Sequence, residues 1–206
     1  MSKIRVGLFL SFIFFTASSL RADEGDPIYN VPQIKGINVD GEASDWKDQG
    51  FRIEVLSPMD GRIGPSEKFD ASVRLAWNNF GLMVWVAVAD STPSSNDTVE
   101  LGDSVELFVG EAGVPASGTV RYIIAPGGKE ARYRIADLRA QYLHRNKPQL
   151  KAVSRKTGAG YVVEALIPLK KENRLTFQIV INDVNGQKLS RYAWYPRDDT
   201  DVQSRS

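Results

Sequence analysis

The sequence has no cysteine and a single histidine, His144. The lack of cysteine excludes a disulfide framework, a lipid-modified cysteine and every thiolate metal site. His144 stands beside Arg145 in a charged segment with no nucleophile motif around it, so we interpret it as a solvated side chain rather than a catalytic base. At 206 residues and 42% hydrophobic composition, the chain has enough apolar material to build a core without cross-links.

An excess of positive charge is also missing. The 26 basic and 25 acidic residues give a formal net charge of +1, whereas a nucleic-acid-binding domain presents a basic face. Beyond residue 22, no apolar run is long and uncharged enough to cross a bilayer as a helix. The sequence therefore predicts neither nucleic acid as a partner nor a membrane span.

The first 22 residues have the pattern of a secretory signal peptide. Lys3 and Arg5 precede an apolar run at 6–15, and small residues follow up to Ala22. This order of basic, apolar and small residues is typical of a Sec-type signal. We therefore expect a signal peptide at 1–22, a secreted or periplasmic protein, and one mature domain over 23–206.

Strand patterns dominate the remaining chain and are separated by Gly, Asn, Asp and Pro. The clearest hairpin joins 71–77 to 82–90 across Asn78-Asn79-Phe80-Gly81, and its second arm is apolar on both faces. A short helical turn at 42–48 with Trp46 inward and a weak helix at 137–146 complete the pattern. The fold class predicted is all-β, an antiparallel β-sandwich of jelly-roll or immunoglobulin-like type. The expected strands are 34–39, 51–56, 71–77, 82–90, 104–109, 120–125, 132–135, 150–155, 161–167, 175–181 and 189–195.

Polar residues inside otherwise apolar strands are the strongest candidates for a binding site. Glu106, Arg121 and Asn182 each interrupt such a strand, and burying them costs several kcal/mol unless they are paired. Together they offer the donors and acceptors that sugar hydroxyls need. Two alternatives remain open: Glu106 and Arg121 form an internal ion pair, or Glu106 points into water from a half-exposed strand.

Other acidic residues suggest further chemistry. Glu106 and Glu164 are both mid-strand and could form the carboxylate pair of a glycosidase, although an outward-facing charge is the ordinary explanation for Glu164. Acidic loops on a sandwich suit a structural Ca²⁺ ion, without the regular spacing of a known calcium loop. The candidate clusters are Asp40, Glu42 and Asp45; Asp90, Asp97 and Asp103; and Asp198, Asp199 and Asp201.

The order and spacing of several motifs resemble the family-nine carbohydrate-binding modules, which are DOMON-like β-sandwiches often attached to xylanases and other secreted glycoside hydrolases. The resemblance covers most of the mature chain. The motifs are Val39-Asp40-Gly41-Glu42 followed by Trp46; Val73-Arg74-Leu75-Ala76-Trp77-Asn78 leading into Leu82-Met83-Val84-Trp85-Val86; Asp103-Ser104-Val105-Glu106-Leu107-Phe108; Gly160-Tyr161-Val162-Val163-Glu164-Ala165-Leu166-Ile167-Pro168; and Phe177-Gln178-Ile179-Val180-Ile181-Asn182-Asp183 before Trp194.

The resemblance implies a non-catalytic module that binds a saccharide or polysaccharide between two tryptophans, over a floor formed by Glu106, Arg121 and Asn182. It also implies bound calcium and a secreted glycoside hydrolase as partner. Neither clamping tryptophan is present: Glu100 occupies one position, and the segment 198–202 has no aromatic residue. We expect Trp194 or Tyr195 to serve as a wall instead.

Three rival functions remain. The sandwich can be a structural or interaction protein that has lost its ligand, and the missing tryptophans favour this reading. It can be part of a glycoside-hydrolase system. It can also be a haem-binding DOMON domain that uses Met83 or His144, which the apolar setting of Met83 disfavours.

Overall fold

The described part of the chain contains eleven strands, which form two sheets, and one short 3-10 turn. The computed structural model describes residues 28–59, 69–94, 96, 98–111, 119–127, 133–137, 150–169 and 174–195. The predicted signal peptide and the predicted helix at 137–146 lie outside these residues, except that Asp137 ends a strand. The strands are β1 Phe51–Ile53, β2 Ser57–Pro58, β3 Asp70–Asn78, β4 Gly81–Ala89, β5 Ser104–Glu111, β6 Val120–Ile124, β7 Tyr133–Asp137, β8 Lys151–Thr157, β9 Gly160–Pro168, β10 Leu175–Asn185 and β11 Lys188–Ala193, with the turn at Val99–Leu101.

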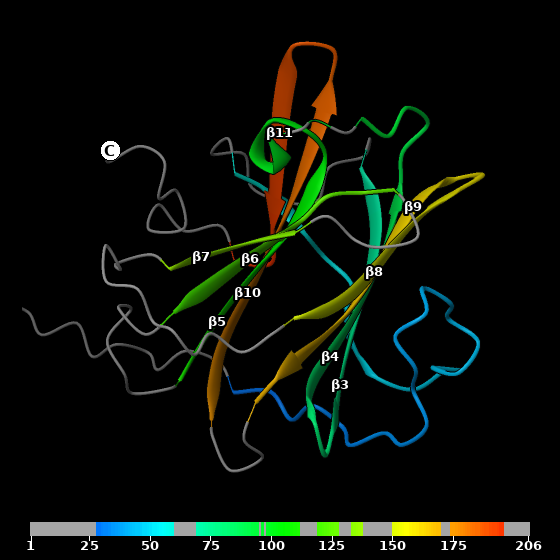
Figure 1. Cartoon of the computed structure of the whole chain (residues 1–206), viewed down its shortest axis with the longest axis vertical. Helices are drawn as coiled ribbons and strands as arrows, with labels where there is room; N and C mark the ends of the chain where they lie inside the picture. The colour runs from blue at the N-terminus through cyan, green and yellow to red at the C-terminus, as the bar shows by residue number, and fades with distance from the viewer. Residues whose placement is uncertain are drawn as a thin grey trace, which may run out of the picture.

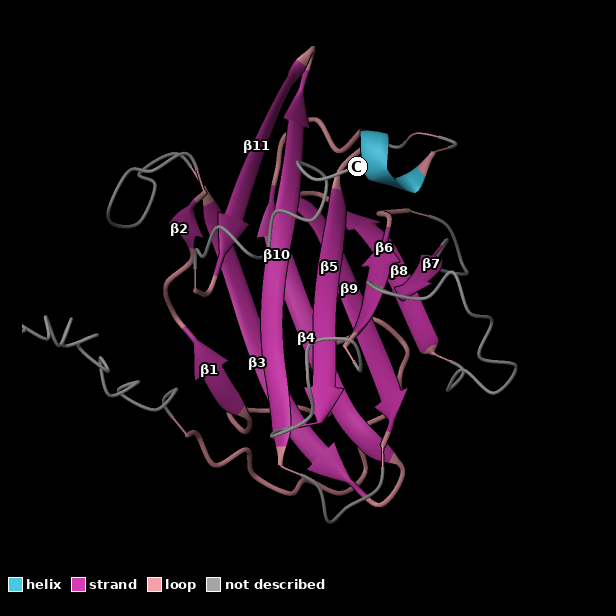
Figure 2. Ribbon diagram, turned by 90° about the vertical axis from the view of Figure 1, so that its left-hand side faces the viewer, coloured by secondary structure: helices cyan, strands magenta, loops and turns pink. Residues whose placement is uncertain are grey.

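The two sheets lie face to face as an antiparallel β-sandwich, which confirms the predicted fold class. One sheet has the order β1-β3-β4-β9-β8, and the other has the order β2-β11-β10-β5-β6-β7. Figure 1 shows them as two layers, with β5, β6, β7 and β10 on one side and β3, β4, β8 and β9 on the other. Figure 2 looks onto the outer face of the six-stranded sheet, where β5 and β10 run side by side.

The core between the sheets is built by alternation along each strand. Val73 and Leu75 of β3 and Val105 and Leu107 of β5 are at most 2% exposed, and they meet in one cluster that contains residues of both sheets. β4 is buried on both faces, as its continuous apolar sequence predicts. The predicted β3–β4 hairpin is confirmed, with Asn78 paired to Gly81 across the turn.

The outer face of the five-stranded sheet is covered by the segment that precedes β1. Ile34, Ile37 and Val39 pack with Trp46 and with the outward side chains of β4 and β9. The predicted strand at 34–39 is wrong, because this segment lies across a sheet face rather than along a sheet edge. Its only pairing among the described residues is a single parallel bridge from Gln33 to Trp77. No helix in the described part of the chain is long and apolar enough to cross a membrane.

Candidate functional site

A polar network occupies the outer face of the six-stranded sheet, where the strands β10, β5 and β6 lie next to one another. The Glu106 carboxylate on β5 accepts a hydrogen bond from Arg121 Nε at 2.8 Å and lies 2.8 Å from Arg121 Nη2. Its other oxygen accepts a hydrogen bond from Asn182 Nδ2 at 2.6 Å. The sheet therefore brings together the three residues that the sequence singled out.

Two further residues, Ser104 and Arg191, belong to this network, and sequence reasoning missed both. Asn182 Nδ2 also donates to Ser104 Oγ at 2.9 Å, and Arg191 Nε donates to Asn182 Oδ1 at 3.1 Å. Arg191 Nη2 also lies 3.8 Å from the Glu106 carboxylate. The sequence could have predicted Arg191, because the hairpin turn at Asn185-Gly186 pairs Arg191 with Asn182 on the neighbouring strand.

The network is buried, although it lies on the outer side of the sheet. Glu106 and Asn182 are each 2% exposed and Arg121 is 7% exposed, so the reading of Glu106 as a solvated strand residue is wrong. The Arg121 guanidinium also lies over the Phe108 ring, 5.7 Å from its centroid. Phe108 packs with Val180, Ala193 and Met59, so apolar surface lies directly beside the charged groups.

The two predicted wall residues follow the end of β11. Trp194 packs against the central core and against the rings of Tyr29, Phe51 and Phe177. The backbone of Tyr195 is held by the Gln178 side chain, which accepts a hydrogen bond from Tyr195 N at 3.2 Å and donates one to Tyr195 O. The hydroxyl groups of Tyr195 and Tyr29 are hydrogen-bonded to each other. A ligand role for Trp194 or Tyr195 stays a prediction.

Glu164 lies on the other side of the sandwich. Alternation along β9 turns it to the outer face of the five-stranded sheet, beside Val162, so the core of both sheets separates it from Glu106. Packed sheets are about 10 Å apart, and carboxylates on the two outer faces are farther apart than the spacing of either class of glycosidase. The alternative of a glycosidase pair, which the sequence left open, is therefore wrong.

Glu164 fastens the N-terminal segment to the sheet. Its Oε2 atom accepts hydrogen bonds from the backbone N–H groups of Asp40 at 2.8 Å and Gly41 at 2.7 Å, and its Oε1 accepts one from Trp46 Nε1 at 2.7 Å. The side chain is fully buried, which corrects the interpretation of an outward-facing charge. Burial raises the pKa of Glu164, and the three hydrogen bonds lower it by less.

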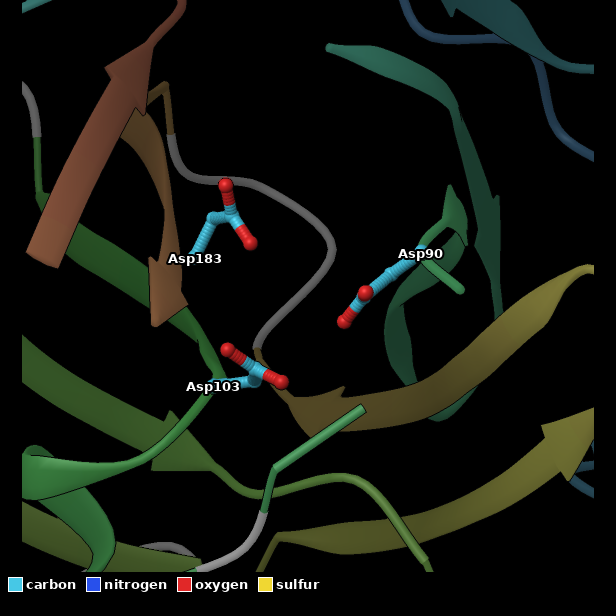
Figure 3. A group of neighbouring side chains, drawn as sticks. All are labelled: Asp90, Asp103 and Asp183. Carbon is cyan, nitrogen blue, oxygen red and sulfur yellow. The ribbon is translucent and has the colours of Figure 1, made fainter. Parts of the chain in front are cut away.

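Three aspartates meet where the two sheets come together at one end of the sandwich. Asp90 follows β4, Asp103 precedes β5 and Asp183 belongs to β10; Figure 3 shows their carboxylates turned toward one another. One oxygen of each lies within 4.8 Å of the others. The sequence had grouped Asp90 with Asp103, but the third member of that group, Asp97, lies outside the described residues, and Asp183 was missed.

The charge of this aspartate cluster is poorly compensated. Burial and the neighbouring Asp90 raise the pKa of Asp103 to about 6, although the backbone N–H groups of Val184 and Ser94 donate to its carboxylate. Burial and Asp90 also raise the pKa of Asp183. Within the described ranges, no polar group donates to the buried Oδ2 of Asp90. Such a group of oxygens has the chemistry to hold a hard divalent cation.

A buried hydroxyl, that of Tyr161, also fits a bound ligand beside the aspartates. Tyr161 is 1% exposed, and its hydroxyl has no hydrogen-bond partner among the described residues. Burial raises the pKa of Tyr161, and the charges of Asp103, Asp90 and Asp183 raise it further. Buried polar groups are nearly always paired, so the unpartnered hydroxyl and the unpartnered Asp90 oxygen fit a ligand at this point.

Of the two residues named for haem binding, Met83 lies in the described part of the chain. Met83 is 1% exposed and packs with Trp46, Trp85 and Ala76 under the N-terminal segment. His144 lies outside the described residues. The thioether of Met83 therefore fills a packed apolar cluster.

Comparison with known proteins gives a family model and related solved structures. The model described as carbohydrate family 9 binding domain-like matches residues 39–204. A carbohydrate binding module family 9 from Caldicellulosiruptor kristjanssonii, in complex with cellotriose, superposes with a TM-score of 0.63 at 16% identity, over 82% of this chain and 85% of that chain. A second family 9 module structure from that organism, in complex with glucose, gives 0.62 at 16% identity, over 82% and 86%. No curated protein matches.

Proposed function

The chain belongs to the carbohydrate family 9 binding domain-like family, as its motifs predicted, and on this premise we propose that it is a non-catalytic module that binds a saccharide. The site is the outer face of the six-stranded sheet. Glu106, Arg121 and Asn182 form its floor, together with Arg191 and Ser104. The single observation that carries this proposal is the convergence of these polar groups on adjacent strands, beside apolar surface.

The floor holds its donors and acceptors in place before a ligand arrives. The bonds from Arg121 to Glu106 use its Nε and Nη2 groups, and no described residue bonds the other terminal amino group, which would serve a sugar hydroxyl. The Asn182 amide is fixed from both sides, by Glu106 and by Arg191. A preorganised floor costs little ordering entropy on binding, which suits a ligand with many hydroxyls.

Tyr195 is the better of the two wall candidates. Gln178, which holds its backbone, stands four residues before Asn182 on the same face of β10, about 13 Å away along the strand. A saccharide that extends from the floor along β10 would reach this residue. Trp194 packs behind it, with the two rings 4.9 Å apart, and would support the wall rather than touch the sugar.

A divalent cation, Ca²⁺ by its preference for carboxylate oxygens, is proposed for the aspartate cluster of Asp90, Asp103 and Asp183. The unpartnered Tyr161 hydroxyl and Asp90 oxygen support it. The ion would neutralise carboxylates that repel one another and tie β4 to β5 and β10. It would act on stability and on loop position, with no step in a reaction.

The cellular setting is proposed from the sequence. The signal-peptide pattern at 1–22 supports export, to the periplasm or outside the cell. A module of this kind would raise the local concentration of a secreted glycoside hydrolase on its polysaccharide, through effective concentration rather than chemistry.

The test is calorimetric titration of the purified protein with glucose, cellotriose and a panel of soluble polysaccharides. Binding is expected for at least one, and Glu106→Gln is expected to weaken it at least tenfold, because the Asn182 amide and Arg121 lose their charged partner. Glu54→Gln, at an exposed position before β2, is the matched control. Both variants must unfold cooperatively.

The outcome that overturns the proposal is a folded protein that binds none of these sugars, or a Glu106→Gln variant that binds as well as the parent. The network would then be an internal ion pair of an interaction protein with the same fold. The pairing of Glu106 with both Arg121 and Asn182 is the observation that favours this second candidate. Co-purification of a stable protein partner would identify it.

A further inference from the structure

A cleft lies on the opposite side of the sandwich from the Glu106 network, on the outer face of the five-stranded sheet. It has a volume of about 480 Å³ and runs between the N-terminal segment at 35–39 and the tip of the β3–β4 hairpin. Met83 and Leu166 form part of its floor. Figure 1 shows the N-terminal segment passing beside the β3–β4 tip, and the hydrogen bond from Gln33 Nε2 to Asn79 Oδ1 at 3.2 Å ties the two walls together.

One wall of this cleft presents an exposed aromatic ring. Phe80 is 73% exposed, which is more than any other aromatic residue in the described part of the chain. Its backbone is fixed, because Asn78 Oδ1 accepts hydrogen bonds from Phe80 N at 2.8 Å and Gly81 N at 3.1 Å, and Leu169 N donates to Phe80 O. An aromatic ring on a rigid turn offers a flat apolar surface at low entropic cost, which suits stacking against the apolar face of a sugar ring.

The rest of the rim offers hydrogen-bonding groups and positive charge. The side-chain amides of Gln33, Asn38 and Asn79 line the cleft, and each can donate and accept. Lys35 and Lys151 also line it, whereas none of the described lining residues carries a carboxylate. Both lysines are exposed, and neither ammonium group has an ion pair or hydrogen bond within the described part of the chain.

We propose that this cleft is a second carbohydrate site, specific for an acidic saccharide that carries uronate groups. Phe80 would stack on a sugar ring, the amides would bond its hydroxyls, and Lys35 and Lys151 would pair with its carboxylates. The charge of the lining decides between acidic and neutral sugars, because two unpaired ammonium groups with no nearby lining acid attract an anion. The site shares no residue with the network around Glu106, and it stands whether or not that network binds a sugar.

The experiment is an NMR titration of the purified protein with oligogalacturonate, read from backbone amide shifts, and calorimetry for affinity. Oligogalacturonate is expected to shift the amides at 35–39 and 78–81. Phe80→Ala and the double variant Lys35→Met with Lys151→Met are each expected to weaken affinity about tenfold. The double variant is also expected to lose most of the salt dependence.

Leu101→Ala and Lys188→Met are the matched controls, at exposed positions away from the cleft, and neither is expected to change the affinity. Glu106→Gln is expected to leave the shifts at 35–39 and 78–81 unchanged, which separates this site from the one on the six-stranded sheet. The proposal is overturned if oligogalacturonate shifts none of these amides, if the lysine variant binds as well as the parent, or if cellotriose binds the cleft as tightly as the acidic sugar does.

Discussion

Replacement of Glu164 tests how the N-terminal segment is held on the five-stranded sheet. The segment has no strand pairing beyond one bridge, and the Glu164 carboxylate accepts two of its backbone N–H groups and the Trp46 indole N–H. The same segment forms a wall of the cleft beside Phe80. Loss of the carboxylate should therefore affect both the stability of the sandwich and the shape of that cleft.

The magnitude follows from the donors left without an acceptor. In Glu164→Ala the indole N–H of Trp46 and the Gly41 N–H remain buried, at about 1–3 kcal/mol each, whereas the N–H of the exposed Asp40 can reach water. We expect a loss of about 3–5 kcal/mol, including the space left by the side chain. In Glu164→Gln one acceptor remains and a buried charge is removed, so the expected loss is about 1–2 kcal/mol.

The pH dependence gives an independent check. The folded protein raises the pKa of Glu164, so the carboxyl loses its proton at lower pH in the unfolded chain than in the folded one. The contribution of Glu164 to stability therefore falls as the pH rises from the unfolded pKa through the folded one. Glu164→Gln has no proton to lose, and this part of the pH dependence should disappear.

Urea unfolding at several pH values measures both effects. Glu54→Ala and Glu54→Gln are the controls, because Glu54 is exposed. A Glu164→Ala variant that loses less than about 1 kcal/mol would refute the reasoning, since two buried donors left without their acceptor cost more than that. An unchanged pH slope in Glu164→Gln would refute the assignment of the slope to this residue.

Three further predictions concern the two ends of the sandwich and its charged network. Arg121→Met leaves the buried Glu106 carboxylate without its nearest cation and should cost about 3 kcal/mol of stability in urea unfolding. Most of this loss should be regained in the double variant with Glu106→Leu, and a loss below about 1 kcal/mol would contradict a buried pair. Calcium at about a hundred times its dissociation constant should raise the melting temperature measured by calorimetry by roughly 5–10 °C relative to EDTA. Asp183→Asn should abolish this rise. Equal melting curves with and without calcium would count against the ion. Gly81→Ala would place a Cβ atom 2.0 Å from the backbone oxygen of Ile167 at a φ of +151°, so it should cost more than about 3 kcal/mol of stability in urea unfolding. In the control Gly158→Ala the added Cβ atom has no neighbouring atom within 4 Å, and the change should be close to neutral.

Much of the fold could be predicted because it depends on local patterns. The alternation of Val73 and Leu75, the two-sided apolar run of β4 and the Asn185-Gly186 turn each act over a few residues. The predicted strand at 34–39 failed for the opposite reason. Its apolar residues pack on a sheet face, and no local pattern states whether an apolar segment joins a sheet or covers one.

The site was predicted in part. Glu106, Arg121 and Asn182 were identified because polar residues inside apolar strands must find partners, and the structure brings them together. Glu164 is also a polar residue inside an apolar strand, yet it holds a loop in place on the opposite face. The type of residue was the same in both cases, and only its position relative to other strands separated a candidate binding group from an anchor.

The sequence by itself determined that the chain forms an antiparallel sandwich, which strand faces are apolar, and which strands carry a polar group, because these properties depend on period-two alternation and on turn residues. Tertiary structure alone decided which sheet each strand joins, and hence that Glu106 and Glu164 lie on opposite outer faces. It also decided that Asp90, Asp103 and Asp183 meet although they are far apart along the chain. The physical reason is that sheet order and contacts between the sheets depend on long-range packing, which no short stretch of sequence encodes.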